Sequence, residues 1–139
     1  MNQNKPSHTT TLPILWSQMD ANGHVNNGTY QYLFDEARMQ ALDHVGFSVA
    51  KLRSESIGPV VLKAELTYHK PVSHPDSVRI ETGFGDGNKI KGKVLQNMYR
   101  VSDGALVCEA VFLALFFDFK KGRPMKLPDF FLNQVLTNV

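Results

Sequence analysis

A short segment, MDANGHVNNGTY (residues 19–30), holds an unusual concentration of polar side chains. It carries a carboxylate at Asp20 and an imidazole at His24, and either group could act as a base or a nucleophile. Gly23 and Gly28 allow a ligand to approach the backbone closely. The segment precedes a helical pattern, and the unpaired amides of a helix N-terminus can stabilise an oxyanion that forms on a carbonyl. These residue types in this order could therefore form an acyl-transfer site.

The same segment also has a purely structural interpretation. Polar, glycine-rich turns commonly precede helices, and Asp20, Asn26 and Asn27 are residue types that cap helix ends or close turns. The residue types alone therefore leave open both a catalytic turn and an ordinary capped turn.

The composition indicates one globular domain over residues 1–139. Hydrophobic residues make up 42% and charged residues 20%, as in a folded chain and not a disordered one. A formal net charge of +2 gives no broad basic surface, so we expect no nucleic-acid partner. The longest apolar run, residues 105–117, contains Glu109 and is shorter than the roughly 18 residues that a membrane span needs. We therefore expect no membrane association.

Cysteine and histidine usage argues against other kinds of site. The single cysteine, Cys108, cannot form an intrachain disulfide, and the N-terminal residues contain no apolar signal segment, which together favour the reducing cytoplasm. Four further histidines lack the spacing of metal ligands, so we expect no metal and no other cofactor. They are His8, His44, His69 and His74.

Hydrophobic periodicity predicts the elements that would hold the polar segment in place. Residues 9–16 alternate as on a strand, and residues 27–45 repeat every 3.6 residues, as on a helix about 28 Å long. Four antiparallel strands are predicted after the helix, at 60–68, 78–84, 89–101 and 105–119. Residues 1–8 are expected to form a loose tail, and residues 120–139 a C-terminal extension with a short helix at 130–136. The predicted fold class is therefore α+β.

One helix cannot cover both faces of a five-stranded sheet. The last predicted strand is almost entirely apolar, as a strand covered on both faces would be. We therefore expect a second subunit to pair with or pack on this one, as a homodimer or as a tetramer built from two dimers.

The motif DANGHVNNGTYQYLFDEAR (residues 20–38) resembles the signature D-x-x-G-H-V-N-N-x-x-Y-x-x-x-F-x-x-A-R of the 4-hydroxybenzoyl-CoA thioesterase-like family of hotdog-fold acyl-CoA thioesterases. Every specified position matches. The later segment ELTYHKPVSHPDSVRIET (65–82) is similar to the second and third strands of that family, and the resemblance covers roughly residues 9–119. It implies a long central helix wrapped by a curved five-stranded sheet, two subunits that join their sheets, and active sites at the subunit boundary.

The resemblance also implies roles for individual residues. The catalytic carboxylate of the family falls on Asp20, as general base or nucleophile, and its oxyanion donor, a backbone amide of the first helical turn, falls on Asn27. Asp20, Asn22 and His24 share the D-x-N-x-H spacing of acyl-ACP thioesterases of the same fold. That spacing implies that Asn22 orients the water or the carbonyl and that His24 exchanges a proton. One position departs from the pattern, because many relatives have an aspartate where this chain has Gln18, which leaves Asp20 with less like-charge repulsion.

Further residues are assigned to substrate binding. Gly23 and Asn26 belong to the turn itself. Lys120, Lys121 and Arg123 form a basic cluster near the end of the last predicted strand, which is either a solvated loop or a contact for the phosphates of coenzyme A.

Together these observations predict an acyl-CoA thioesterase that hydrolyses an acyl-CoA substrate to a carboxylic acid and free coenzyme A. Two alternatives stay open at this point. One is an acyl-ACP thioesterase of the same fold, and the other is a non-catalytic acyl-CoA-binding protein.

Overall fold

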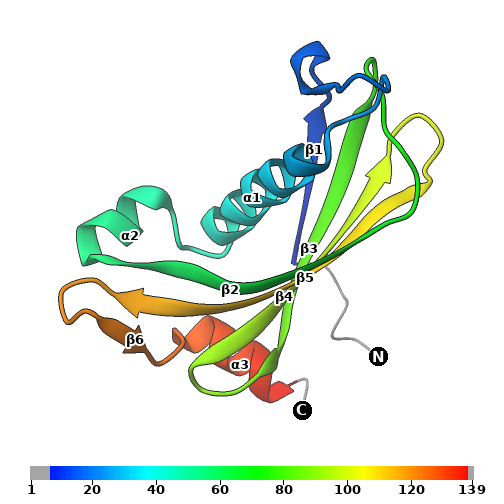
Figure 1. Ribbon diagram of the computed structural model, residues 1–139. Helices are drawn as coiled ribbons and strands as arrows, with labels where there is room; N and C mark the ends of the chain where they lie inside the picture. Colours follow the sequence, from blue (N-terminus) through cyan, green and yellow to red (C-terminus); the bar gives the residue numbers. More distant parts are fainter. Residues whose placement is uncertain (1–6, 138–139) are drawn as a thin grey trace.

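The structure, a computed structural model, describes residues 7–137 (Figure 1). In chain order the elements are β1 (His8–Pro13), the 3-10 helix η2 (Trp16–Gln18), α1 (Asn27–His44), α2 (Val49–Glu55), β2 (Ile57–Tyr68), β3 (Ser77–Gly87), β4 (Lys91–Arg100), β5 (Leu106–Asp118), β6 (Arg123–Met125) and α3 (Asp129–Thr137). Among the described residues, no helix is long and apolar enough to cross a membrane.

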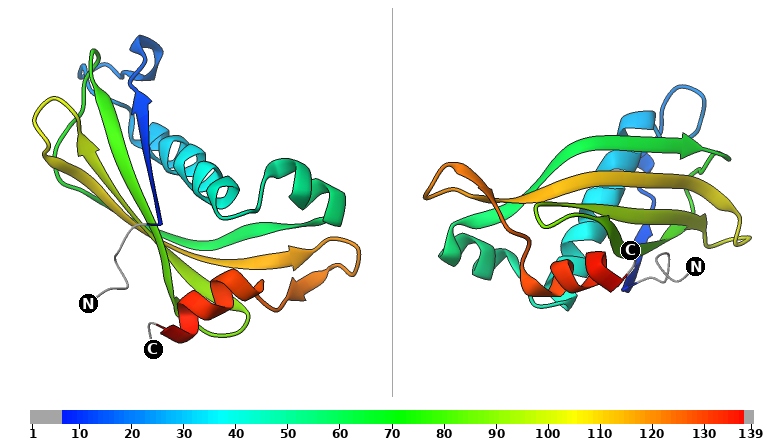
Figure 2. Two further views of the ribbon diagram at one scale, coloured as in Figure 1. Left: turned by 180° about the vertical axis from the view of Figure 1, so that it is seen from behind. Right: turned by 90° about the horizontal axis from the view of Figure 1, so that it is seen from below.

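The strands form one antiparallel sheet in the order β1-β3-β4-β5-β2, and the short β6 pairs with the end of β5. The chain therefore crosses from one side of the sheet to the other between β2 and β3, through residues 69–76. β2 pairs with β5 alone, and the right-hand view of Figure 2 shows β2 running along one edge of the sheet. Within the described part of the chain, the other side of β2 has no strand partner.

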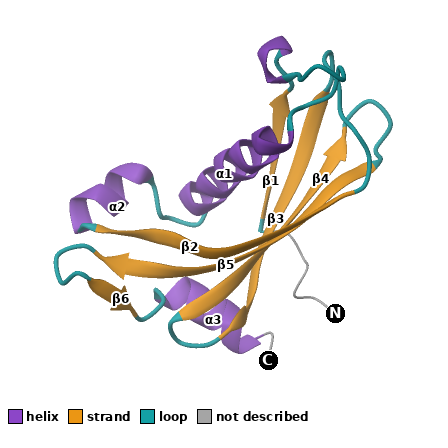
Figure 3. Cartoon of the chain, viewed as in Figure 1, coloured by secondary structure: helices purple, strands orange, loops and turns teal. Residues whose placement is uncertain are grey.

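The helix α1 crosses the inner face of the curved sheet and buries one side of its surface there (Figure 3). Gly46, with φ +101°, follows the end of α1 in the left-handed conformation that commonly ends helices. The buried residues of α1 recur at helical spacing, namely Tyr30, Leu33, Phe34, Ala37, Ala41 and Leu42. They pack on the inner face of the sheet, where the ring centroids of Phe34 and Phe112 lie 5.9 Å apart. The predicted helix at 27–45 is confirmed.

A polar network in the middle of this core ties α1 to the sheet. Gln96 on β4 is fully buried, and its side-chain amide donates to the Phe34 carbonyl oxygen at 3.1 Å and to the Thr82 hydroxyl at 3.0 Å. Its Oε1 accepts from Arg38 Nη1 at 3.0 Å, and Arg38 is also paired with Asp35. Both polar atoms of the Gln96 side chain thus have partners, as buried polar groups require.

The first strand is shorter than predicted. β1 ends at Pro13, whereas the alternating pattern continued to Trp16, which instead begins η2 and is 75% exposed. Proline cannot donate to a strand ladder, and the Leu15 amide then donates to the side chain of Gln18 at 2.8 Å, which ends the extended conformation. At the other end, β1 begins at His8, which had been predicted to belong to the tail at residues 1–8. Residues 1–6 of that predicted tail lie outside the described residues.

The alternation predicted for β2 changes phase partway along the strand. The pairing with β5 has a bulge between Val61 and Lys63. Ala64 lies opposite Phe112 of the inner face, and Pro59 lies opposite Phe116. Because the bulge adds one residue to β2, odd-numbered residues before it and even-numbered residues after it face inward.

The C-terminal extension is more structured than a connector. The predicted helix at 130–136 is confirmed as α3, and the β6 strand precedes it. Phe131 of α3 packs against Phe47, Phe84 and Phe116, with ring centroids 5.1 to 5.3 Å away. The structure thus adds β6 and the short α2 to the predicted elements, each too short to show a reliable hydrophobic period.

Cys108 provides a test of the packing of β5. Its side chain is fully buried on the inner face, and this burial raises the pKa of the thiol to about 12. Because the thiolate is the reactive form, we expect no measurable alkylation by iodoacetamide in the folded protein at about pH 8. Mass spectrometry should detect the alkylated thiol only after unfolding in guanidinium chloride. Rapid alkylation of the folded protein would contradict this placement.

Candidate active site

The polar segment folds as a tight turn, here called the site turn (residues 19–26), between η2 and α1. Its two sides are joined by backbone hydrogen bonds from the Asp20 amide to the His24 carbonyl (2.8 Å) and from the Asn26 amide to the Gln18 carbonyl (2.9 Å). At the tip, Gly23 has φ +75°, a conformation that residues with a Cβ rarely adopt. The site turn therefore brings Asp20 back toward the start of α1.

The crossover between β2 and β3 holds the site turn in position. The Val25 amide donates to the Val72 carbonyl at 2.8 Å, and both side chains are buried. The Ser73 hydroxyl donates to the Gly23 carbonyl at 2.7 Å. Two segments that are distant in the sequence thus fix the backbone that carries Asp20.

Asp20 is half-buried and closes the site turn with one of its carboxylate oxygens. Its Oδ1 accepts the backbone amides of Asn22 at 2.8 Å and of His24 at 3.4 Å. Its Oδ2 has no hydrogen-bond donor within residues 7–137. Oδ1 of Asp20 therefore has the structural role of closing the turn, while Oδ2 remains available to a water molecule or a substrate.

The first amides of α1 differ in how they are satisfied. Asn26 caps the helix, because its Oδ1 accepts the Gly28 amide at 2.9 Å and its carbonyl accepts the Thr29 amide at 2.9 Å. The Asn27 amide has no acceptor in the described part of the chain. It is therefore a free donor at the positive end of a helix, where an oxyanion would be stabilised.

The remaining predicted catalytic side chains are exposed. Asn22, His24 and Asn27 all project from the site turn or the helix start, and their side chains have no hydrogen bond within the described residues. The structure thus gathers the four predicted catalytic residues at one turn. It joins Asp20 to the backbone of Asn22 and His24, and not to their side chains.

Two tyrosines border the helix start. The Tyr68 hydroxyl donates to the Asn27 carbonyl at 3.5 Å, and its ring meets that of Tyr30 edge to face with centroids 5.1 Å apart. Burial raises the pKa of both phenols above their ordinary value. Both hydroxyls therefore stay protonated at neutral pH, and that of Tyr68 is a hydrogen-bond donor at the helix start.

The basic cluster lies elsewhere. Lys120, Lys121 and Arg123 are exposed at the turn between β5 and β6, which Figure 1 shows at the opposite end of the sheet from the site turn. One chain alone therefore does not bring this cluster to Asp20. Within residues 7–137, no group of three or more His, Cys, Asp or Glu side chains is placed to hold a metal ion.

Comparison with known sequences decides the family. The sequence model of the thioesterase-like superfamily matches residues 14–135. The chain belongs to this superfamily. The thioesterase family predicted from the motif is therefore confirmed, together with the hotdog fold and the class of thioester hydrolases.

Individual relatives have nearly the same length and the same fold as this member of the superfamily. The acyl-CoA thioester hydrolase YbgC of Escherichia coli O6:H1 is 28% identical over 117 residues, which cover 83% of this chain and 85% of YbgC. The PA2801 protein of Pseudomonas aeruginosa has a TM-score of 0.82 at 29% identity, covering 90% of this chain and 95% of that chain. SAV2348 of Staphylococcus aureus, solved in complex with CoA, has a TM-score of 0.83 at 17% identity, covering 94% and 82%, a likeness of fold alone.

Sequence reasoning gave no role to three residues that shape the site of this thioesterase-like chain. Tyr68, Val72 and Ser73 contact the helix start or the site turn. They lie in the segment TYHKPVSHP, whose similarity to the family was recognisable. No signal in a single sequence, however, places residue 73 beside residue 23.

The cap of α1 can be tested by substitution. Asn26→Ala removes the acceptor of the Gly28 amide, so we expect the free energy of unfolding to fall by about 1 kcal/mol, the usual cost of losing an N-cap. Asn26→Ser retains a capping oxygen and should stay close to the wild type. Urea unfolding of the three proteins measures the difference. Equal stability of the alanine and serine variants would show that Asn26 is not an effective cap.

Proposed function

We propose that this protein is an acyl-CoA thioesterase that hydrolyses an acyl-CoA to a carboxylic acid and free coenzyme A. The observation that carries the proposal is the presence, at one turn, of a carboxylate oxygen of Asp20 and a backbone amide of Asn27 that both lack partners among the described residues. The likeness to YbgC, which is named as an acyl-CoA thioester hydrolase, and to the CoA complex of SAV2348 supports coenzyme A as the carrier.

In the proposed mechanism Asp20 takes a proton from a water molecule as the water oxygen attacks the thioester carbonyl carbon. The carbonyl oxygen becomes an oxyanion and accepts a hydrogen bond from the Asn27 amide. Collapse of this intermediate breaks the carbon–sulfur bond, and the leaving thiolate takes the proton from Asp20. The hydrogen bonds from the Asn22 and His24 amides fix the direction of the carboxylate, so little reorganisation precedes the attack.

The exposed side chains of the site turn are given supporting roles. Asn22 orients the attacking water or the carbonyl, and His24 exchanges a proton with the leaving group or the solvent. Gly23 and Asn26 contact the substrate through the backbone at the tip of the turn and the helix start. Direct attack by Asp20 on the carbonyl is the alternative chemistry for the same residue.

The open edge of β2 supports a homodimer. A strand of twelve residues with one unpaired side is a template for pairing with another chain, and proteins generally cover such edges. Val61 and Leu62 are 42% and 47% exposed on this strand. Pairing of two β2 strands about a two-fold axis would cover these side chains and join the two sheets.

Charge complementarity selects the register of that pairing. Lys63 and Glu65 lie on the outer face of β2 with their charged groups 2.9 Å apart, and the hydrogen bond from Lys63 lowers the pKa of Glu65. An axis beside Ala64 places Lys63 opposite the partner's Glu65, and the reverse. Because the bulge adds one residue beyond this pair, Tyr68 then lies opposite the partner's Pro59.

This register gives the basic cluster a role. Ile57 at the start of β2 pairs with Asp118, next to the turn that carries Lys120, Lys121 and Arg123. In the proposed dimer this end of β2 lies beside the end of the partner's β2, and hence near the partner's crossover and site turn. The cluster is therefore proposed to contact the phosphates of a coenzyme A bound at the partner's site turn.

The role of Asp20 is tested by Asp20→Asn. Asparagine retains an Oδ1 that can accept the Asn22 and His24 amides, so the site turn should keep its conformation. Because it is neither a base nor an effective nucleophile, we expect kcat for acyl-CoA hydrolysis to fall by at least about 10²-fold. Thiol release from a panel of acyl-CoA esters measures this, and Asp43→Asn, an exposed carboxylate on α1, is the matched control.

Single turnover of the wild type in oxygen-18 water separates the two roles of Asp20. Attack by water assisted by Asp20 labels the product and never Asp20. Direct attack forms a mixed anhydride of Asp20 and the acyl group, and when water cleaves it at the Asp20 carboxyl carbon, the first product is unlabelled and the label enters Asp20. Near-normal turnover of Asp20→Asn would show that the proposed chemistry is wrong.

The proposed β2 interface is tested by charge reversal. Lys63→Glu would place like charges opposite each other twice per dimer, so we expect the dissociation constant of the dimer to rise about ten-fold at low salt. The double variant Lys63→Glu/Glu65→Lys restores the opposite charges and should restore the affinity. Analytical ultracentrifugation measures both, with Lys120→Glu as a control outside β2. A double variant as weak as the single one would argue against this register.

A further inference from the structure

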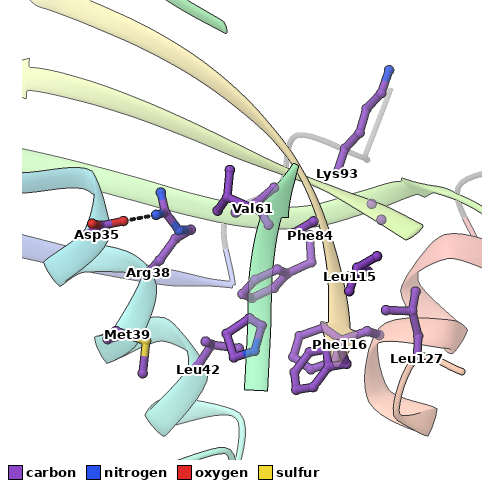
Figure 4. A pocket seen from close by; sticks show the side chains of 16 residues that line it. Asp35, Arg38, Met39, Leu42, Val61, Phe84, Lys93, Leu115, Phe116 and Leu127 are labelled. Atoms are coloured by element: carbon purple, nitrogen blue, oxygen red, sulfur yellow. Dashed lines mark hydrogen bonds and ion pairs between the residues drawn. The ribbon is translucent and has the colours of Figure 1, made fainter. Parts of the chain in front are cut away.

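The proposed reaction needs the Asp20 carboxylate and the Asn27 amide at a fixed separation, and different parts of the fold hold these two groups. Asn27 opens α1, which the Gln96 network binds to the sheet. Figure 4 shows the outer part of that network, where Arg38 pairs with Asp35 on the wall of a cavity of about 350 Å³ between the second half of α1 and the sheet. The Asp20 carboxylate lies instead on the site turn, whose backbone is bound to the crossover.

The middle of the crossover is bonded to the segment around the site turn at several points. The Val72 carbonyl and the Ser73 hydroxyl bind the site turn, as described above. In addition, the His74 amide lies 3.3 Å from Met19 Sδ, and His74 Nδ1 lies 2.8 Å from the Ile14 carbonyl oxygen. The middle of the crossover and the site turn are therefore bonded into one unit.

Arg100, the last residue of β4, binds the crossover from the sheet side. Its Nη1 donates to the Pro71 carbonyl at 2.7 Å, while its Nε and Nη2 donate to the Asp103 carboxylate at 3.1 Å and 2.6 Å. Pro71 directly precedes Val72, whose carbonyl accepts the Val25 amide. The carbonyl that Arg100 holds is thus the neighbour of the carbonyl that holds the site turn.

Asp103 keeps the guanidinium group of Arg100 directed at the crossover. Its Oδ1 also accepts the Ala105 amide at 3.0 Å, which fixes the carboxylate in the turn between β4 and β5. The hydrogen bonds from Arg100 lower the pKa of Asp103 to about 2, so the pair stays charged at neutral pH. A planar guanidinium can bind a carboxylate at two points and still donate to a third acceptor, which a lysine ammonium does not reproduce.

The two ends of the crossover have their own bonds to the sheet side. The His69 amide donates to the Val107 carbonyl at 2.9 Å, and the Ser102 hydroxyl donates to Asp76 Oδ2 at 2.6 Å. Within the described part of the chain, the bond from Arg100 is the one that joins the backbone between these ends to the sheet. Removing it should therefore release the middle of the crossover and leave its ends in place.

We propose that Arg100 is a positioning residue for thioester hydrolysis. It holds the middle of the crossover, which in turn keeps the Asp20 carboxylate at its working distance from the Asn27 amide. The inference rests on the proposed thioesterase function. Arg100 acts only through the backbone of the crossover and the site turn. Because a displacement of about 1 Å at the reacting groups can cost about 10²-fold in rate, we expect its loss to lower the rate more than the substrate affinity.

Steady-state kinetics of Arg100→Met test this role. Methionine keeps an unbranched apolar side chain but removes every donor, so we expect kcat to fall at least about ten-fold while KM stays within about two-fold. Octanoyl-CoA and benzoyl-CoA serve as the aliphatic and the aromatic probe. The matched control is Arg79→Met, which removes an arginine paired with Glu81 on β3 and should keep the wild-type kcat. A wild-type kcat in folded Arg100→Met would overturn the inference.

A second substitution separates positioning from a general loss of stability. Ser73→Ala removes the hydroxyl that binds the Gly23 carbonyl, so it loosens the same connection one step further along. If Arg100 acts through this connection, the double variant Arg100→Met/Ser73→Ala should have a kcat close to that of the less active single variant. Effects on kcat that multiply would show that the two residues act independently, and the inference would be wrong.

Hydrogen exchange tests the contact without the reaction. The Val25 amide should exchange at least about ten-fold faster in Arg100→Met, while amides in the middle of α1 exchange as in the wild type. A wild type that hydrolyses no acyl-CoA overturns the proposed function and with it the catalytic purpose of the contact. An active wild type with unchanged exchange at Val25 in the variant overturns the inference alone.

If Arg100→Met does not fold, as judged by circular dichroism, Arg100→Lys replaces it in the same measurements. Lysine retains the charge but cannot bind Asp103 at two points and Pro71 together, so the same changes in kcat and in exchange at Val25 are expected in the same direction. Wild-type values of both for Arg100→Lys would overturn the inference.

Discussion

The side chain of Gln96 sits in the centre of an apolar core with its amide bound on three sides. It connects the Phe34 carbonyl of α1, the Thr82 hydroxyl of β3 and the Arg38 guanidinium in one network. Removing any partner would leave a buried polar group unsatisfied, at a cost of about 1–3 kcal/mol, whereas apolar contacts tolerate small shifts. This network therefore sets where α1 lies along the sheet. The site turn depends on that position, because it directly precedes α1.

The site turn combines structural and chemical demands in the same residues. Asp20 closes the turn with one oxygen and is proposed to act on water with the other, while Asn26 satisfies two helix amides and leaves the Asn27 amide without an acceptor. A cap that satisfied every amide would stabilise the helix and remove the oxyanion donor. The contacts that Val72 and Ser73 make with the site turn hold its backbone in place, which compensates for the incomplete capping of α1.

In the proposed dimer, the edge position of β2 links catalysis to assembly. With β2 open, a second chain can add its own sheet and bring its basic cluster near the helix start of the first chain. In the proposed arrangement Asp20 of one chain carries out the chemistry, and the basic cluster of the other chain contacts coenzyme A. Neither function then operates in an isolated chain.

The sequence by itself determined the long helix and the longer strands, and it indicated the candidate catalytic residues. The 3.6-residue period fixed α1, because that period depends only on which side chains are apolar. The motif at residues 20–38 identified the thioesterase family, while the choice between Asn26 and Asn27 as the helix cap was made by the structure. The sequence did not reveal the end of β1 or the bulge in β2, since both depend on hydrogen bonds to particular partners. Only the tertiary structure decided that Ser73 anchors Gly23 and that Gln96 holds α1. These are contacts between distant segments, and no local pattern of residue types specifies them.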